Sequence, residues 1–260
     1  MKLSILQMNI QLGNFSANLE TLQRQLALAM ETRPDVVLLP ELWDIGFYPR
    51  PIEKYADPDG GRIRKILGDL AAQYQINIVG GSIANRIGQH VFNTSYVFDR
   101  TGHLVSTYHK THLFSPLGEA HDFTAGDTIS TYTIDGVKCA TLVCYDIRFP
   151  ELVRRLALEK ISLLFVPAAW PIERLMHWQT LTRARAIENQ IFVAAANGSG
   201  SFEDGIQLGG HSRIIDPWGE ILAEAGEEEN TLHANLRLVI LNQIRESMSI
   251  FSDRRPELYE

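Results

Sequence analysis

Short apolar runs that alternate with amphipathic segments are the feature that most constrains how this chain folds. Runs such as residues 35–39 and 162–167 are largely apolar and rich in branched side chains, which is typical of strands covered on both faces. Segments such as residues 18–32 instead carry apolar side chains at helical spacing. Those positions are Leu19, Leu22, Leu26, Ala29 and Met30. The alternation predicts an α/β fold with buried sheets.

The same pattern places the elements along the chain. We expect helices over residues 18–32, 61–74, 150–159 and 174–189. We expect strands over residues 3–8, 35–39, 76–83, 94–99, 137–143, 162–167, 191–196, 212–216 and 231–235. The chain has 260 residues and shows no repeat, linker or low-complexity tract, so we predict one domain over residues 1–260.

Charge and cysteine content argue against several classes of protein. The 24 Lys and Arg residues against 31 Asp and Glu residues give a formal net charge of −7, and a mildly acidic chain binds a nucleic-acid backbone poorly. If residues 137–143 form a strand, the Cα atoms of Cys139 and Cys144 lie roughly 16 Å apart, beyond the limit of about 7 Å for a disulfide. Unpaired thiols favour a reducing compartment. We find no signal peptide and no apolar run near the roughly 18 residues of a membrane span, so we expect no membrane partner and a cytoplasmic location.

Cys144 has a position suited to a nucleophile. It ends an apolar run, and the following residues 145–150 lead into a helix that Pro150 is well placed to start. A thiol on a tight strand-to-helix turn is presented above the sheet edge, beside free backbone N–H groups that stabilise an oxyanion. Most free cysteines are instead small buried hydrophobes, an interpretation that suits Cys139. Position alone leaves both interpretations of Cys144 open.

Three charged residues have positions compatible with catalysis. Glu41 follows an apolar run, and ligand sites in open α/β sheets lie at the carboxyl ends of strands. Spacing alone slightly favours a structural role for Glu41, as a carboxylate stabilised by the dipole at a helix N-terminus. Lys110, and Glu119 in a loop flanked by glycine and proline, are also compatible with solvated surface positions. None of the three identifies a site by itself.

Taken together, these residues resemble the three motifs of the nitrilase superfamily of carbon–nitrogen hydrolases. The glutamate motif is similar to Leu39-Pro-Glu-Leu-Trp43, the lysine motif to His109-Lys-Thr-His-Leu-Phe114, and the cysteine motif to Cys144-Tyr-Asp-Ile-Arg-Phe-Pro-Glu-Leu152. Flanking segments at residues 92–96, 183–190, 210–212 and 216–219 match as well. The resemblance therefore covers nearly the whole chain.

The resemblance implies a fold, a catalytic set and an assembly. The fold is a four-layer α-β-β-α sandwich, and the catalytic residues are Glu41, Lys110 and Cys144. The additional glutamate of the family, a short distance before a Gly-Asp pair, falls on Glu119. The family implies a homodimer, and the apolar residues in segment 251–259 are more than a free tail requires. Neither a metal nor an organic cofactor is expected.

The chemistry implied by this set is thioester catalysis. A free thiol is only a few per cent ionised at neutral pH, so proton transfer to Glu41 during attack is more plausible than a resting thiolate. Cys144 adds to the substrate carbonyl while Lys110 and the N–H of Tyr145 hold the oxyanion. Glu41 then protonates the departing ammonia and activates the water that hydrolyses the thioester. Glu119 is expected to position the substrate or Lys110.

The expected substrate is a small-molecule amide. Within the superfamily, the cysteine motif and the segments Pro167-Ala-Ala-Trp-Pro171 and His177-Trp178 are most similar to bacterial omega-amidases, which hydrolyse 2-oxoglutaramate and related ω-monoamides. Such substrates carry a carboxylate, and a pocket for them needs a cation. Arg148 and Arg174 are the candidates, although an ion pair with Asp146 or Glu151 is an equal alternative for Arg148.

Three aromatic residues are candidates for the apolar walls of the pocket. They are Trp43, Tyr48 and Trp170, for each of which core packing is a close alternative.

Other functions are also compatible with the sequence. His109, His112 and His121 suggest a metal-dependent hydrolase, but the chain has neither a His-Glu-x-x-His nor a Cys-x-x-Cys arrangement. An N-carbamoyl hydrolase, a nitrilase and a deaminated-glutathione amidase are alternative activities within the superfamily. A non-catalytic ligand-binding scaffold is a weaker alternative, since a pure binder does not need the glutamate, the lysine and the cysteine together.

Overall fold

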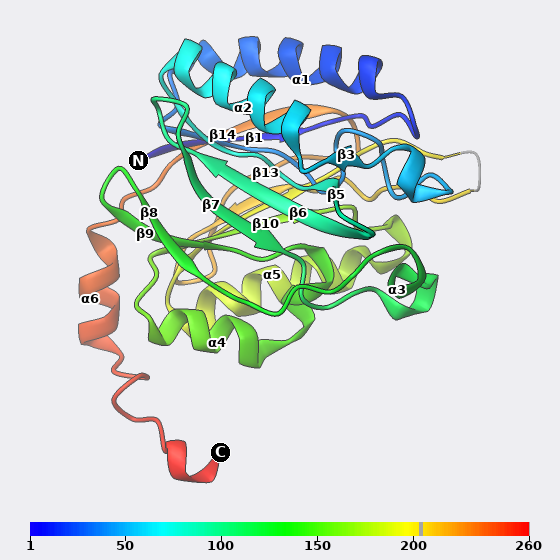
Figure 1. Ribbon diagram of the computed structural model, residues 1–260. Coiled ribbons are helices and arrows are strands. Elements are labelled where there is room, and N and C mark those ends of the chain that lie inside the picture. The colour runs from blue at the N-terminus through cyan, green and yellow to red at the C-terminus, as the bar shows by residue number, and fades with distance from the viewer. Residues whose placement is uncertain (203–204, 260) are drawn as a thin grey trace.

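Two β-sheets stacked face to face make up the centre of this protein. The computed structural model describes residues 1–202 and 205–259. Helices α1 and α2 cover the outer face of one sheet, and α4 and α5 cover the outer face of the other (Figure 1). This arrangement confirms the α/β fold class and the four-layer α-β-β-α sandwich.

Among the described residues, the first sheet has eight strands and the second has six. The order in the first is β14-β1-β2-β4-β6-β5-β3, with β7 paired to β6. Its strands are β1 (Lys2–Gln7), β2 (Val36–Leu38), β3 (Asp57–Pro58), β4 (Asn77–Val79), β5 (Ile83–Ile87), β6 (His90–Phe98), β7 (Leu104–His109) and β14 (Asn230–Asn235). The second runs β13-β12-β11-β10-β9-β8. Its strands are β8 (Thr131–Ile134), β9 (Val137–Thr141), β10 (Leu163–Ala168), β11 (Phe192–Asn197), β12 (Arg213–Ile215) and β13 (Ile221–Glu224).

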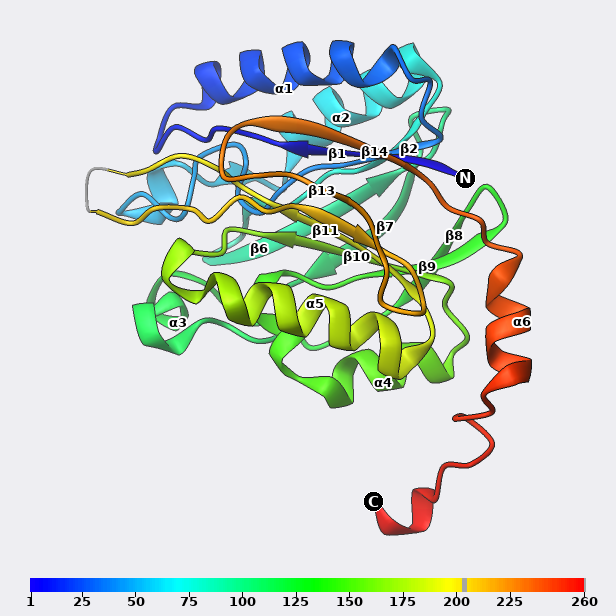
Figure 2. The same cartoon turned by 180° about the vertical axis from the view of Figure 1, so that it is seen from behind.

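Four helices agree closely with their expected positions, namely α1 (Phe15–Met30), α2 (Gly61–Tyr74), α4 (Pro150–Leu158) and α5 (Leu175–Asn189). Two more were not expected, α3 (Glu119–Asp122) and α6 (Ile240–Ser247). Helix α1 begins three residues earlier than expected because the Asn14 side chain accepts a hydrogen bond from the Ala17 N–H and caps the helix there. None of the described helices is long and apolar enough to cross a bilayer. Figure 2 shows α6 and the segment after it leading away from the sandwich.

Side-chain alternation along β2 explains how the layers are joined. Val36 and Leu38 pack between the sheets in one apolar cluster with Phe165 of the second sheet. Val37 belongs to a different cluster, which it shares with Leu22 of α1. Because successive side chains of a strand point to opposite faces, a strand covered on both sides must be apolar throughout.

The strand expected over residues 76–83 is confirmed only as far as Val79, because the chain turns after that residue. Strand β4 ends at Val79 and β5 begins at Ile83. Between them, Gly81 has φ +62°, and a Cβ at this position would lie 2.0 Å from the Pro40 carbonyl oxygen. Only glycine tolerates both the backbone conformation and the close approach. The turn therefore packs against the segment that follows β2.

Candidate active site

Four residues singled out in the sequence meet beyond the ends of strands from both sheets. Glu41 lies shortly after β2, and Lys110 follows β7 directly. Glu119 begins α3, while Cys144 follows β9 and begins a 3-10 turn over Cys144–Arg148. All four side chains are buried, Cys144 being the most accessible at 8% exposure. The packing of the two sheets brings these separate segments together.

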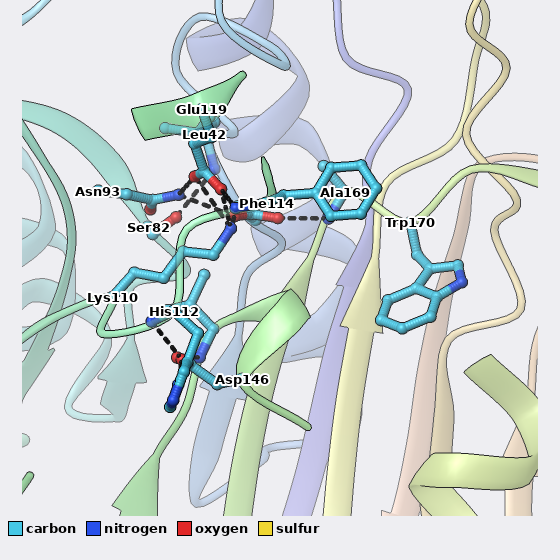
Figure 3. Close-up of polar contacts among 12 residues, drawn as sticks. Leu42, Ser82, Asn93, Lys110, His112, Phe114, Glu119, Asp146, Ala169 and Trp170 are labelled. Atoms are coloured by element: carbon cyan, nitrogen blue, oxygen red, sulfur yellow. Dashed lines mark hydrogen bonds and ion pairs between the residues drawn. The ribbon is translucent and has the colours of Figure 1, made fainter. Parts of the chain in front are cut away.

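The Lys110 ammonium is the centre of this group. Its Nζ donates to Glu41 Oε1 at 2.9 Å and to the two carboxylate oxygens of Glu119 at 2.9 and 2.8 Å (Figure 3). Burial alone would lower the pKa of Lys110, but the Glu119 and Glu41 carboxylates raise it well above its ordinary value. An ammonium has three N–H donors. All three are therefore directed at carboxylates in the resting protein.

Asn93 of β6 holds both glutamates in place. Its side-chain N–H group donates to Glu41 Oε1 at 2.8 Å and to Glu119 Oε1 at 3.3 Å. The other oxygen of Glu41 accepts the N–H of Ala169, just after β10 of the second sheet, at 2.9 Å. Sequence patterns assigned no role to Asn93. The available signal was a run of three polar residues, 93–95, inside a strand that is otherwise buried.

The turn that carries Glu41 is held by the glycine-containing segment after β4. Leu42, which has φ +47°, donates its N–H to Ser82 Oγ at 3.1 Å. Trp43 is fully buried, and its indole N–H donates to the Gly80 carbonyl at 3.0 Å. The expectation that Trp43 forms a wall of the substrate pocket is therefore wrong: it packs in the core cluster shared with α1 and α2.

The Cys144 backbone has the strained geometry of a presented nucleophile. Its φ of +48° lies in the left-handed region that side-chain-bearing residues rarely adopt. Burial, followed by the Glu41 carboxylate, raises the pKa of the Cys144 thiol well above its ordinary value. The Lys110 ammonium and a hydrogen bond from Ala169 act in the opposite direction without reversing the shift. The direction of this shift favours a protonated thiol at rest, beside the Glu41 carboxylate.

A cavity of about 270 Å³ opens onto this group. Its lining includes Cys144 and Lys110, together with Tyr145, Arg148, Trp170 and Arg174. The remaining lining residues are Phe47, Phe114, Leu117, Ala169, Pro171, Glu173, Gly205 and Ile206. A concave, mostly apolar site with a few convergent polar groups is typical of small-molecule binding.

Two guanidinium groups face this cavity. Arg148 lies 4.6 Å from the centre of the Trp170 ring and donates to His177 Nδ1 at 3.3 Å. Arg174 lies 5.4 Å from the centre of the Phe114 ring. In residues 1–202 and 205–259 neither guanidinium forms an ion pair, so the alternative partners Asp146 and Glu151 considered for Arg148 are wrong. Both cations are left available to an anionic ligand.

Tyr48 lines a neighbouring cavity of about 260 Å³ rather than the one above Cys144. Phe47 contributes to both cavities, and its ring lies 4.2 Å from that of Tyr48. The Tyr48 hydroxyl is buried, and within the described part of the chain it has no hydrogen-bond partner. The proposed wall residue thus lies beside the site and not in it.

The histidines of the metal hypothesis serve other contacts. His109 Nδ1 is hydrogen-bonded to Thr94 Oγ1 at 2.8 Å, and His112 Nδ1 lies 2.9 Å from Asp146 Oδ1. Where the structure describes the chain, no group of three or more His, Cys, Asp or Glu side chains is arranged to hold a metal ion. The three histidines therefore do not form the site that a metal-dependent hydrolase would require.

Comparison with known proteins gives consistent matches over nearly the whole chain. Residues 2–246 match the family model described as carbon-nitrogen hydrolase. The chain is 41% identical over 258 residues to the 2-oxoglutaramate amidase of Bacillus subtilis (strain 168). The aligned region covers 99% of this chain and 98% of the relative.

Solved structures also match this chain over nearly its whole length. XC1258 from Xanthomonas campestris, a CN-hydrolase superfamily protein with an arsenic adduct in its active site, has a TM-score of 0.91 at 29% identity, covering 98% of this chain and 97% of the other. A mutant of the amidase from Nesterenkonia sp. AN1, in which acrylamide has added to the active-site cysteine, has a TM-score of 0.83 at 28% identity, covering 96% and 98%. In that amidase the active-site residue that reacts is a cysteine.

Proposed function

This chain belongs to the carbon–nitrogen hydrolase family, and we propose that it is a cysteine-dependent amidase that releases ammonia from a small ω-monoamide such as 2-oxoglutaramate. The observation that carries the proposal is the buried contact of the Lys110 ammonium with two carboxylates, beside a thiol presented on a strained turn. Similarity to a 2-oxoglutaramate amidase supports the substrate class.

The first step begins from a neutral thiol. As Cys144 Sγ bonds to the amide carbon, its proton passes to Glu41, and the carbonyl oxygen becomes an oxyanion. The raised pKa of Cys144 favours this concerted transfer over a preformed thiolate. The oxyanion forms beside Cys144, where the first N–H groups of the 3-10 turn, Tyr145 included, lack partners within the turn.

Lys110 becomes available to the oxyanion during this transfer. In the resting protein one of its N–H donors is held by Glu41 Oε1. Once Glu41 is protonated, it loses its charge and attracts the ammonium less strongly. That donor then turns to the oxyanion while Glu119 keeps the other two. The interaction is stronger in the transition state than in the ground state, which is the requirement for catalysis.

The remaining steps return Glu41 to its starting state. Glu41 gives its proton to the amide nitrogen, the carbon–nitrogen bond breaks and ammonia leaves a Cys144 thioester. Water then attacks the thioester and gives a proton to Glu41. The carbon–sulfur bond breaks as Glu41 returns this proton to the sulfur, and the carboxylic acid product leaves and loses its own proton to water. None of these steps requires a metal or an organic cofactor.

Arg148 and Arg174 are proposed to bind the distal carboxylate of the substrate. Both line the cavity, and neither has an acidic partner among the residues with described positions. An arginine offers paired N–H donors that match a carboxylate. We expect Arg174→Gln to raise KM for 2-oxoglutaramate while leaving KM for an uncharged amide unchanged. Arg183→Gln, at an exposed position of helix α5, which Arg174 directly precedes, is the matched control.

The test of the proposed function is ammonia release from a panel of substrates. The panel holds 2-oxoglutaramate, succinamate, an N-carbamoyl amino acid, a nitrile and deaminated glutathione, each assayed with the parent protein and with Cys144→Ala. We expect the highest kcat/KM with 2-oxoglutaramate and none above background in the variant. A higher kcat/KM for another substrate would reassign the activity within the family. No turnover of any substrate would favour a binding scaffold.

Assembly and location complete the proposal. We propose a homodimer of single-domain chains, because exposed apolar residues lie on the outer helices and on the extended C-terminal segment. They are Leu158, Met176, Ile187, Leu258 and Tyr259. The two free cysteines favour a reducing compartment, and we propose the cytoplasm.

A further inference from the structure

Asp146 lies two residues after Cys144 and is fully buried. Its Oδ2 accepts the Val143 N–H at 2.9 Å and the Tyr108 hydroxyl at 2.8 Å. Its Oδ1 accepts the Thr111 hydroxyl at 3.0 Å. The same oxygen accepts the backbone N–H and the ring Nδ1–H of His112 at 2.9 Å each (Figure 3). One carboxylate thus accepts five hydrogen bonds, a number that indicates a specific task.

The five donors come from the two segments that carry the nucleophile and the ammonium. Val143 directly precedes Cys144, in the chain that leaves β9 of the second sheet. Thr111 and His112 directly follow Lys110, in the chain that leaves β7 of the first sheet. The Asp146 carboxylate therefore links the two segments across the boundary between the sheets.

The hydrogen bonds around Asp146 need an acceptor at both side-chain oxygens, which an amide in its place does not offer. A carboxylate only accepts hydrogen bonds, so His112 must carry its proton on Nδ1. Burial, followed by the Asp146 charge, raises the pKa of Tyr108 well above its ordinary value, so the phenol keeps its proton and donates. Two of the donors are backbone N–H groups, of Val143 and His112, which cannot reverse their polarity.

We propose that Asp146 is a positioning residue that holds the strained Cys144 turn and the Lys110 segment at the separation that the reaction requires. The inference rests on the proposed function. The left-handed backbone of Cys144 is unfavourable by itself and persists only where the surrounding structure holds it. The hydrogen bond from Val143 to Asp146 spans this residue and supplies that restraint.

The variant Asp146→Asn tests the proposal with little change in shape. The amide replaces one acceptor oxygen with an NH₂ group, which must face the N–H of either Val143 or His112. Because a displacement of about 1 Å can cost roughly 10²-fold in rate, we expect kcat to fall by about that factor. We expect KM to stay within about threefold of the parent, since Asp146 is not part of the cavity lining.

Asp216→Asn is the matched control. Asp216 also accepts backbone N–H groups, from Trp218 and Glu220 at 2.9 Å each, in the turn between β12 and β13. Both variants lose hydrogen bonds to a carboxylate and are expected to lower Tm. Only Asp146→Asn is expected to lower kcat, which separates positioning from stability.

Alkylation of Cys144 by iodoacetamide, located by mass spectrometry, gives a readout that needs no amide turnover. We expect the reaction to slow by about tenfold in Asp146→Asn, because the thiol moves away from Glu41, and to be unchanged in Asp216→Asn. Loss of amide turnover in the parent protein would refute the proposed substrate and leave this measurement intact. A folded Asp146→Asn with the kcat of the parent protein would overturn the role of Asp146. If the parent protein shows no amide turnover, an unchanged rate of Cys144 alkylation in Asp146→Asn would overturn it instead.

A second variant decides the question if Asp146→Asn does not fold. Tyr108→Phe removes one hydroxyl donor to Asp146 and keeps the buried ring and the carboxylate. We expect kcat to fall by about threefold to tenfold at unchanged KM, because one of five restraints is lost. A parental kcat in this variant would then overturn the proposal.

Discussion

Replacing Lys110 with methionine tests the central electrostatic argument. The side chain is fully enclosed, and its ammonium is the counter-charge for both Glu41 and Glu119. Methionine has a similar length but no charge and no donor. The variant therefore removes the expected oxyanion donor. It also leaves the buried carboxylates of Glu41 and Glu119 without their counter-charge, although the Asn93 amide still donates to both.

The expected losses follow from these contacts. Removing one oxyanion donor typically costs about 2.7–4 kcal/mol of transition-state stabilisation, or roughly 10²–10³ in turnover. Breaking a buried ion pair by removing one partner costs about 3–5 kcal/mol of unfolding free energy, because the remaining charge has no partner. A domain with roughly 5–15 kcal/mol of stability can remain folded after such a loss. We therefore expect Lys110→Met to be folded, less stable and lower in turnover by at least that factor.

The assay measures kcat with 2-oxoglutaramate and the free energy of unfolding in urea, with circular dichroism as the check of folding. Lys65→Met is the matched control, because Lys65 pairs with Asp69 on an exposed helix surface at 2.7 Å. Its effect on stability should lie within about 0.5 kcal/mol, with no change in rate. Lys110→Arg should rescue little turnover, since the larger planar guanidinium does not fit an enclosed site built for an ammonium.

The result that refutes this reasoning is a folded Lys110→Met that keeps more than about a tenth of parental turnover. In that case the backbone N–H groups of the Cys144 turn would suffice to hold the oxyanion, and Lys110 would serve only as a counter-charge.

The remaining predictions concern the nucleophile, the pH dependence of stability and the assembly. Cys144→Ala should abolish turnover, whereas Cys139→Ala, within β9, should leave kcat nearly unchanged; equal losses in both would remove the distinction between them. Burial raises the pKa of Asp44 from 3.8 to about 8. Between pH 3.8 and about pH 8 the Asp44 carboxyl is therefore ionised in the unfolded chain and protonated in the folded protein, so the free energy of unfolding falls as pH rises. Asp44→Asn should remove this dependence, raising Tm more at pH 9 than at pH 5, and an equal gain at both would contradict the buried protonated state. Light scattering should find a dimer at micromolar concentration and a shift toward monomer after deletion of residues 249–260; a dimer of parental stability after deletion would exclude that segment from the interface.

Much of the fold could be predicted because burial and periodicity are local properties of the sequence. The limits of α2 match the expected helix at both ends, and the apolar run at β2 predicted a strand covered on both faces. Five strands were missed, namely β3, β5, β7, β8 and β13, as were helices α3 and α6. Strands β7 and β8 mix exposed or half-exposed positions with buried ones, and β13 has only exposed and half-exposed positions. The sequences of these three strands therefore lack the apolar runs on which the prediction depended.

The sequence by itself also predicted which residues carry the proposed chemistry, because Glu41, Lys110 and Cys144 each lie in a distinctive motif near the end of an expected or observed strand. Only the tertiary structure decided what each of them contacts. Glu41 meets Lys110 across 69 positions of the chain and the Ala169 N–H across 128. Such contacts depend on how two sheets pack and on how the chain turns between strands, and no local pattern encodes that geometry. For the same reason Trp43, placed by sequence in the substrate pocket, lies in the core, while Asp146, assigned no catalytic task, joins the two segments on which the reaction depends.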